Sequence, residues 1–278
     1  MKRFRVFGFD LDRRALTLTI EEQEHWNEQA KEQHRKNRQE MLGQLVSEFG
    51  EAATEEKRRN FVDLGPKPLS IFAFHNRFLW QIRTSFVMGG YYPALTAACA
   101  LGERILNYLI LLLRDDYKTT PEYKRVSKKD SFGNWDLAIN TLEAWDVFLP
   151  EVTAEFRKLR DRRNDAVHFR PEVDTNDREL ALGAVRSLES IVSNQFSAFG
   201  PQPWFITDIP GEIYIKKEWE KKPFVHKVYL PNCALVGPKH TIESVMPWAV
   251  KDDYPYESIE ITDEEFSSQR AKATQSSD

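Results

Sequence analysis

The sequence has few of the residues that build metal, redox and phosphate-loop sites. Cys99 and Cys233 are the only two cysteines in 278 residues, and neither lies in a CxxC or zinc-type spacing. A glycine-rich phosphate loop is missing, and His25, His34 and His240 lack neighbours of metal-ligand type. We therefore expect no metal and no cofactor. Cys99 lies in an apolar stretch and is interpreted as a small core residue.

The chain also lacks a strong excess of charge of one sign. Its net charge is −4, which gives no indication of nucleic-acid or membrane affinity. The local distribution is more informative, because residues 151–170 hold six basic against four acidic side chains, and residues 251–278 hold three against eight. One helical segment is thus locally basic and the last segment is acidic.

Segments typical of secretion or membrane insertion are missing as well. The first residues, Met1-Lys2-Arg3-Phe4-Arg5-Val6, contain no apolar core of a leader sequence. Residues 94–113 are long enough to cross a bilayer, but their centre carries Glu103, Arg104 and Asn107, and charge is costly there. The pattern predicts a buried helix in a reduced, cytoplasmic protein that has no membrane contact.

Hydrophobic spacing predicts a mainly α protein: a helical bundle with a small β-rich module formed by the N- and C-terminal segments. We expect a β-hairpin over 3–20, a charged helical segment over 21–60 broken near Gly50, and a boundary at Gly65-Pro66-Lys67-Pro68. Helices are expected at about 70–88, 93–115, 134–149, 151–170 and 177–199, and strands at 212–215 and 224–230. The predicted segments are 1–66, 67–200, 201–262 and a disordered tail, 263–278.

The segment Arg163-Asn164-Asp165-Ala166-Val167-His168 contains the candidate chemistry. In the predicted helix 151–170, the apolar stripe runs through Val152, Phe156, Leu159 and Ala166, and Arg163 occupies the missing position. A cation on such a stripe is costly unless it is paired. The partner that a guanidinium suits best is a phosphate or a carboxylate.

Histidine at the end of this helix suits proton transfer. Asn164 and His168 are four residues apart and share a helix face. Pro171 disfavours helical geometry at Arg170, so the helix is expected to end just after His168, where the dipole favours an imidazolium. An imidazole that titrates near neutral pH both gives and takes protons.

Residues 70–200 resemble a HEPN domain, a helical superfamily rich in ribonucleases. The resemblance depends on Arg163-Asn164-x-x-x-His168 and on Gly89-Gly90-Tyr91-Tyr92-Pro93-Ala94, which leads into Ala98-x-x-x-Gly102-Glu103-Arg104-x-x-Asn107. It implies metal-independent RNA cleavage by a homodimer whose motif helices face each other. It also implies a role as a toxin neutralised by an antitoxin, or as an antiviral-defence effector.

The resemblance assigns roles that agree with the chemistry of the side chains. Arg163 would stabilise charge on the phosphate, His168 would transfer protons, and Asn164 would hold the phosphate or orient the histidine. Glu103 is a candidate supporting residue, paired with Arg163 or His168, or alternatively with Arg104 or solvent. RNA-binding candidates on the same helix are Arg160, Arg162 and Arg170, together with Arg157.

Two other functions remain open at this point. A HEPN-like module could bind a partner or a nucleotide ligand without cutting RNA, because fold does not fix function. The segment Phe9-Asp10-Leu11-Asp12 superficially resembles the Asp-x-Asp of haloacid-dehalogenase-type phosphatases. That chemistry needs a parallel α/β sheet, whereas the chain that follows is predicted to be helical.

Overall fold

The computed structural model describes residues 1–8, 12, 14–167, 176–245 and 247–275, and it divides into two compact units. Unit 1 comprises Met1–Phe9, Leu112–Ser127 and Ser197–Asp278, and unit 2 comprises Asp10–Leu111 and Lys128–Phe196. The two units are interleaved along the chain, which differs from the four successive segments expected from the sequence. The mainly α class with a small β module from the chain ends is confirmed.

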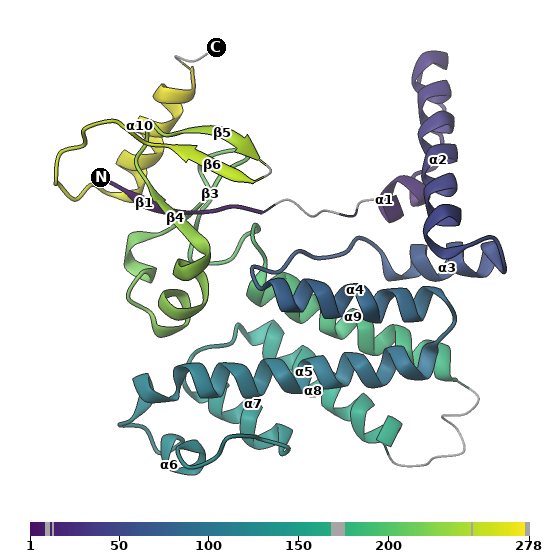
Figure 1. Cartoon of the computed structure of the whole chain (residues 1–278), viewed down its shortest axis with the longest axis horizontal. Helices are drawn as coiled ribbons and strands as arrows, with labels where there is room; N and C mark the ends of the chain where they lie inside the picture. The colour runs from purple at the N-terminus through teal and green to yellow at the C-terminus, as the bar shows by residue number, and fades with distance from the viewer. Residues whose placement is uncertain (9–11, 13, 168–175, 246, 276–278) are drawn as a thin grey trace. The chain divides into compact units, whose positions relative to one another are not determined.

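The described part of unit 2 is helical (Figure 1). Its helices are α1 (Arg14–Thr19), α2 (Glu28–Phe49), α3 (Thr54–Leu64), α4 (Ala73–Val87), α5 (Tyr91–Leu113, whose last two residues belong to unit 1), α7 (Trp135–Ala144), α8 (Pro150–Val167) and α9 (Asp177–Phe196).

Local signals account for several of these helix ends. The Asn134 side chain caps α7 by accepting from the amide of Leu137 at 2.9 Å, as the sequence predicted. Gly50 and Gly65 follow α2 and α3 with positive φ, which glycine adopts without steric cost.

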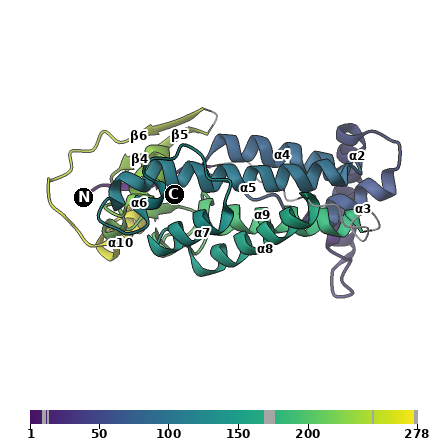
Figure 2. The same cartoon turned by 90° about the horizontal axis from the view of Figure 1, so that it is seen from below.

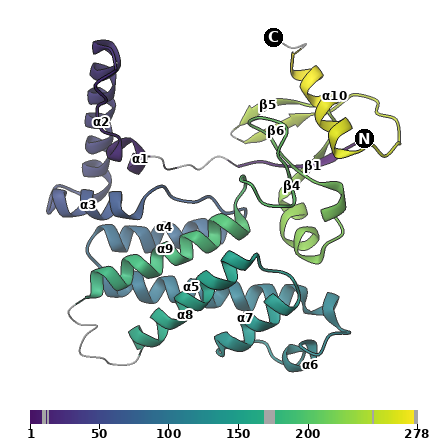
Figure 3. The same cartoon turned by 180° about the vertical axis from the view of Figure 1, so that it is seen from behind.

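The core of unit 2 lies among α4, α5, α8 and α9, whose apolar stripes face one another. The helices α8 and α9 lie side by side, and α9 also contacts α4 (Figures 2 and 3). Gly102 lets α5 approach α8, because a Cβ at this position would lie 2.7 Å from Cδ2 of Leu159. The buried ion pair between Arg83 and Glu189 joins α4 to α9.

Unit 1 contains an antiparallel sheet of strand order β2 (Phe205–Ile206), β3 (Ile213–Ile215), β1 (Arg3–Val6), β4 (Cys233–Val236). In the register of β1, Arg5 pairs with Tyr214 on one side and with Ala234 on the other. A separate hairpin joins β5 (Thr241–Val245) and β6 (Trp248–Lys251). The other elements are η1 (Arg114–Tyr117), α6 (Tyr123–Val126), η3 (Lys217–Trp219), the π-helical η4 (Val225–Tyr229), η5 (Leu230–Asn232) and α10 (Asp263–Gln275).

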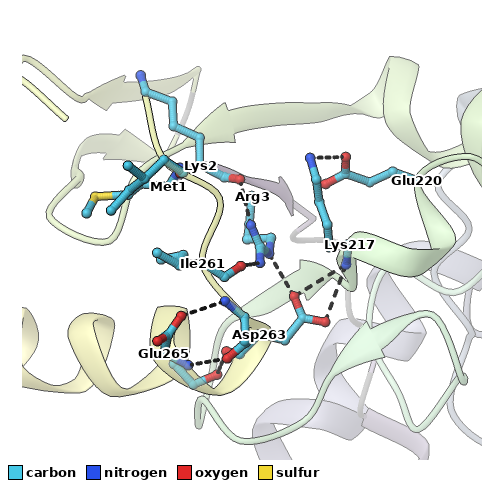
Figure 4. Close-up of polar contacts among 11 residues, drawn as sticks. Met1, Lys2, Arg3, Lys217, Glu220, Ile261, Asp263 and Glu265 are labelled. Atoms are coloured by element: carbon cyan, nitrogen blue, oxygen red, sulfur yellow. Dashed lines mark hydrogen bonds and ion pairs between the residues drawn. The ribbon is translucent and has the colours of Figure 1, made fainter. Parts of the chain in front are cut away.

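Arg3 of β1 holds the start of α10 in unit 1. Its side chain is 2% exposed and donates to Oδ1 of Asp263 at 2.7 Å and to the carbonyl of Ile261 at 2.5 Å (Figure 4). Thr262 and Glu265 form a capping box, in which each side chain accepts from the backbone amide of the other residue. The first strand and the last helix are therefore joined by a buried ion pair.

Three sequence predictions about local structure are wrong. Residues 15–19 of the expected strand lie in α1, because Ala15 and Leu18, three apart, are both buried on one helix face. Residues 225–229 are helical, which buries Val225 beside Phe224. The expected disordered tail contains α10, which buries Phe266 and Arg270 on one face. Residues 276–278 lie outside the described residues.

Helix α5 contains residues 94–113, which were predicted from the sequence to form a buried helix although the segment is long enough to cross a bilayer. The segment Tyr91–Tyr117 is long and apolar enough to cross a membrane by length and composition, and half of its most apolar window is buried within the protein. A core helix of a globular protein passes the same test, so this feature alone does not distinguish the two settings.

Candidate functional site

The candidate site lies where α8 crosses α5 in unit 2. Val152, Phe156 and Leu159 are buried, as the predicted stripe requires. Arg163 continues the stripe, but its side chain is 33% exposed to solvent. The guanidinium is therefore less costly than a fully buried cation, and part of it faces solvent.

Arg163 pairs with Glu103 of α5. Nε of Arg163 lies 3.8 Å from Oε2 of Glu103, which also accepts a hydrogen bond from the Trp135 indole at 3.0 Å. This pairing was one of the alternatives left open by the sequence. Arg104, another of the proposed partners, lies over the ring of Phe78 at 5.2 Å instead.

The other motif residues are described only in part. Asn164 is half-buried near the end of α8. His168 and Arg170 lie outside the described residues, so their places relative to Arg163 are still predictions.

The three described RNA-binding candidates already have protein partners. Arg157 pairs with Glu143 at 2.6 Å. Arg160 pairs with Asp136 and with Asp161, the latter at 2.8 Å. Arg162 lies across α9, where it donates to Oγ of Ser187 at 2.7 Å, and its Nε would lie 2.7 Å from a Cβ at Gly183. Binding of phosphate by any of these arginines therefore competes with existing contacts.

Cys99 lies one turn before Glu103 on α5 and faces the same arginines. Burial raises the pKa of the Cys99 thiol to about 12, against the opposing effect of the Arg163 and Arg162 charges. Cys99 is 6% exposed, which confirms the interpretation of this residue as a core residue, and the raised pKa disfavours its thiolate at neutral pH.

Sequence reasoning missed two parts of this site. Trp135 was predicted to lie in the third helix region, but its contact with Glu103 was not foreseen. Arg104 and Tyr108, four residues apart on α5, line a cavity with Glu103. The available signal was that Arg104 and Tyr108 are polar residues four apart in an apolar helix, and such residues share one helix face.

The phosphatase alternative disagrees with the fold. Asp12 pairs with Arg14 and is followed by α1 and α2, and the strand pairings of the described residues are antiparallel. Residues 9–11 lie outside the described residues. Across the described ranges, no group of three or more His, Cys, Asp or Glu side chains is arranged to hold a metal ion.

Comparisons with protein-family models, curated proteins and solved structures give no match for this chain.

Proposed function

We propose that this protein is a metal-independent endoribonuclease whose site is formed by Arg163, Asn164 and His168, with Glu103 in support. The observation that carries the proposal is the setting of Arg163. The side chain is partly exposed, its contact with Glu103 is longer than a hydrogen bond, and it keeps donor atoms that suit a phosphate.

The proposed reaction uses the RNA itself as nucleophile. The ribose 2′-oxygen attacks the adjacent phosphorus as its proton passes to a base, the bond from phosphorus to the 5′-oxygen breaks, and that oxygen takes a proton from an acid. Arg163 stabilises the charge on the phosphoryl oxygens, and Asn164 holds the phosphate or orients the imidazole. The products are a 2′,3′-cyclic phosphate and a 5′-hydroxyl.

A homodimer completes the proposed site. A single His168 is insufficient for separate acid and base steps, whereas two motif helices facing each other supply two. The proposed biological setting is a toxin or antiviral-defence effector in the cytoplasm, controlled by an antitoxin or regulatory partner. This setting depends on the HEPN resemblance.

The test is cleavage of total RNA and tRNA by the purified protein in EDTA, with analysis of the product ends. We expect cyclic phosphates from the wild type and a loss of at least about 100-fold in His168→Ala and Arg163→Ala. The matched control is Lys158→Ala, which removes an exposed cation of the same helix that pairs with Glu155 and is not among the RNA-binding candidates. Full activity of His168→Ala contradicts the proposal. No cleavage by a folded wild-type dimer favours the non-catalytic binding module.

A further inference from the structure

A cavity beside Glu103 extends the candidate site along α5. Its volume is about 700 Å³, and it is lined by Phe74, Glu103, Arg104 and Tyr108, with Asp130 and Ser131 from the loop before α7. Pockets of this size commonly hold small ligands. The carboxylate of Glu103 belongs both to this cavity and to the ion pair with Arg163.

Asn107 fixes the loop that forms one wall of the cavity. Its Oδ1 accepts from the amide of Phe132 at 2.6 Å, and its Nδ2 donates to the carbonyl of Phe132 at 3.3 Å. Trp135, at the start of α7, donates to Glu103. The end of the loop next to α7 is therefore held to α5 at Phe132 and Trp135, and Asp130 and Ser131, which precede these anchors, are exposed at the cavity.

Aromatic rings form the opposite wall. Phe74 and Phe78 of α4 are only partly buried. Phe74 meets Tyr108 with ring centres 5.7 Å apart, and Phe78 supports the guanidinium of Arg104. Tyr108 keeps 37% of its surface exposed, so one aromatic residue in this cavity is accessible for stacking.

The polar side chains have the donor and acceptor pattern that guanine requires. A carboxylate only accepts hydrogen bonds and a guanidinium only donates them. Guanine offers two donors on its Watson–Crick edge and two acceptors, O6 and N7, on its Hoogsteen edge. Asp130 matches the donors, Arg104 matches the acceptors, and the ring of Tyr108 stacks against the base. Adenine offers an acceptor where guanine has its N1 donor, and cytosine has a single donor group.

We propose that this cavity binds an unpaired guanine of single-stranded RNA, next to the phosphate bound at Arg163. The inference rests on the proposed ribonuclease function, and it assigns the substrate class as single-stranded RNA with a guanine near the cut. Bases that are splayed out of single strands are commonly bound by aromatic stacking together with edge recognition.

The test measures binding separately from cleavage. Fluorescein-labelled hexanucleotides with every 2′-hydroxyl methylated cannot be cut by the proposed mechanism, so fluorescence anisotropy with the full-length protein reports affinity alone. Five positions are uracil and one is guanine, adenine or cytosine. We expect the guanine hexamer to bind about tenfold more tightly than the others, since a good bidentate contact discriminates by roughly 5- to 150-fold.

Matched variants assign the preference to the cavity. Tyr108→Leu and Arg104→Gln should abolish the guanine preference. Two controls should keep it: Tyr92→Leu, on the exposed face of the same helix, and Arg77→Gln, which removes the other guanidinium over Phe78. Circular dichroism and thermal unfolding check that each variant is folded.

The outcomes separate this inference from the proposed function. Cleavage of RNA with equal affinity for all hexamers overturns the guanine site and leaves the ribonuclease proposal intact. A guanine preference that depends on Tyr108, without any cleavage, supports the site and contradicts the enzyme. Competition by guanosine 5′-monophosphate as strong as by the hexamer overturns the assignment to RNA. A Tyr108→Leu variant that turns a dimer into a monomer in light scattering overturns the inference, since a second copy then covers the cavity.

Discussion

Gly102 of α5 lies against the ring of Trp135 on α7, and a Cβ at Gly102 would lie 2.9 Å from Cη2 of that ring. The next residue, Glu103, accepts the hydrogen bond from the same indole. The contact with Gly102 and the hydrogen bond to Glu103 both hold the Trp135 ring in place. The ring in turn orients the Glu103 carboxylate that faces Arg163.

Gly102→Ala should destabilise unit 2 by about 1–2 kcal/mol. The added methyl overpacks against Trp135 and Leu159, and the gain in helix propensity offsets only part of this cost. Denaturant unfolding measures the change. The control is Gly43→Ala, an exposed position in α2 with no atom within 4 Å of the added Cβ, which should stabilise the protein by up to about 1 kcal/mol. Equal effects of the two substitutions would contradict the tight contact.

Glu103→Gln should lower kcat for RNA cleavage by about tenfold while KM changes by less than about threefold. An amide oxygen still accepts from the Trp135 indole, so the fold is kept, whereas the charge that orients Arg163 is removed. Steady-state kinetics on a defined RNA separate the two constants. If Glu103 only stabilises the fold, kcat should stay unchanged in the folded Gln variant.

Unit 1 should lose stability as the pH falls from 6.5 to about 4. His240 is buried, its Nε2 accepts from Arg5 and its Nδ1 donates to the carbonyl of Gly237. Burial first, and then the nearby charges of Arg270 and Arg5, lower its pKa to about 4. Between these two pKa values the unfolded chain therefore binds a proton that the folded chain does not bind. The free energy of unfolding falls by about 3 kcal/mol in total once the pH is below both values.

The pH dependence of thermal unfolding tests this assignment. His240→Gln removes the titrating group, so its stability should fall less steeply than that of the wild type between pH 6.5 and 4. Parallel pH profiles of the two proteins would show that other groups cause the acid sensitivity.

Both thiols should resist alkylation in the native protein at pH 8. Burial raises the pKa of Cys99 and of Cys233 to about 12, so neither forms an appreciable thiolate. Cys99 belongs to unit 2 and Cys233 to unit 1. Pulsed labelling in increasing urea, followed by peptide mass spectrometry, should therefore report the opening of each unit separately. Rapid labelling of either thiol without denaturant would contradict its raised pKa.

The sequence predicted the elements that local signals define. The cap at Asn134, the break near Gly50 and the strand near Ile213 all appear in the structure. The stripe on α8 also predicted that the cation at position 163 needs a partner, and Glu103 was among the partners considered for Arg163.

Elements that depend on distant contacts were not predictable in the same way. The alternating residues 16–20 favour a strand, but burial of Leu18 against other helices selects α1. The helix α10 had a local signal that was missed, the capping box of Thr262 and Glu265. In the site, the Trp135–Glu103 contact joins residues 32 positions apart, and no sequence spacing reports such a contact.

The ion pair of Arg3 and Asp263 sets an order of events during translation. The described helices of unit 2 all precede residue 197, so they are available for packing before Asp263 is synthesised. Unit 1 completes only when Asp263 and Phe266 leave the ribosome and reach the first strand. The helices of the candidate site therefore come first in this order of folding events, and the closure of unit 1 comes last.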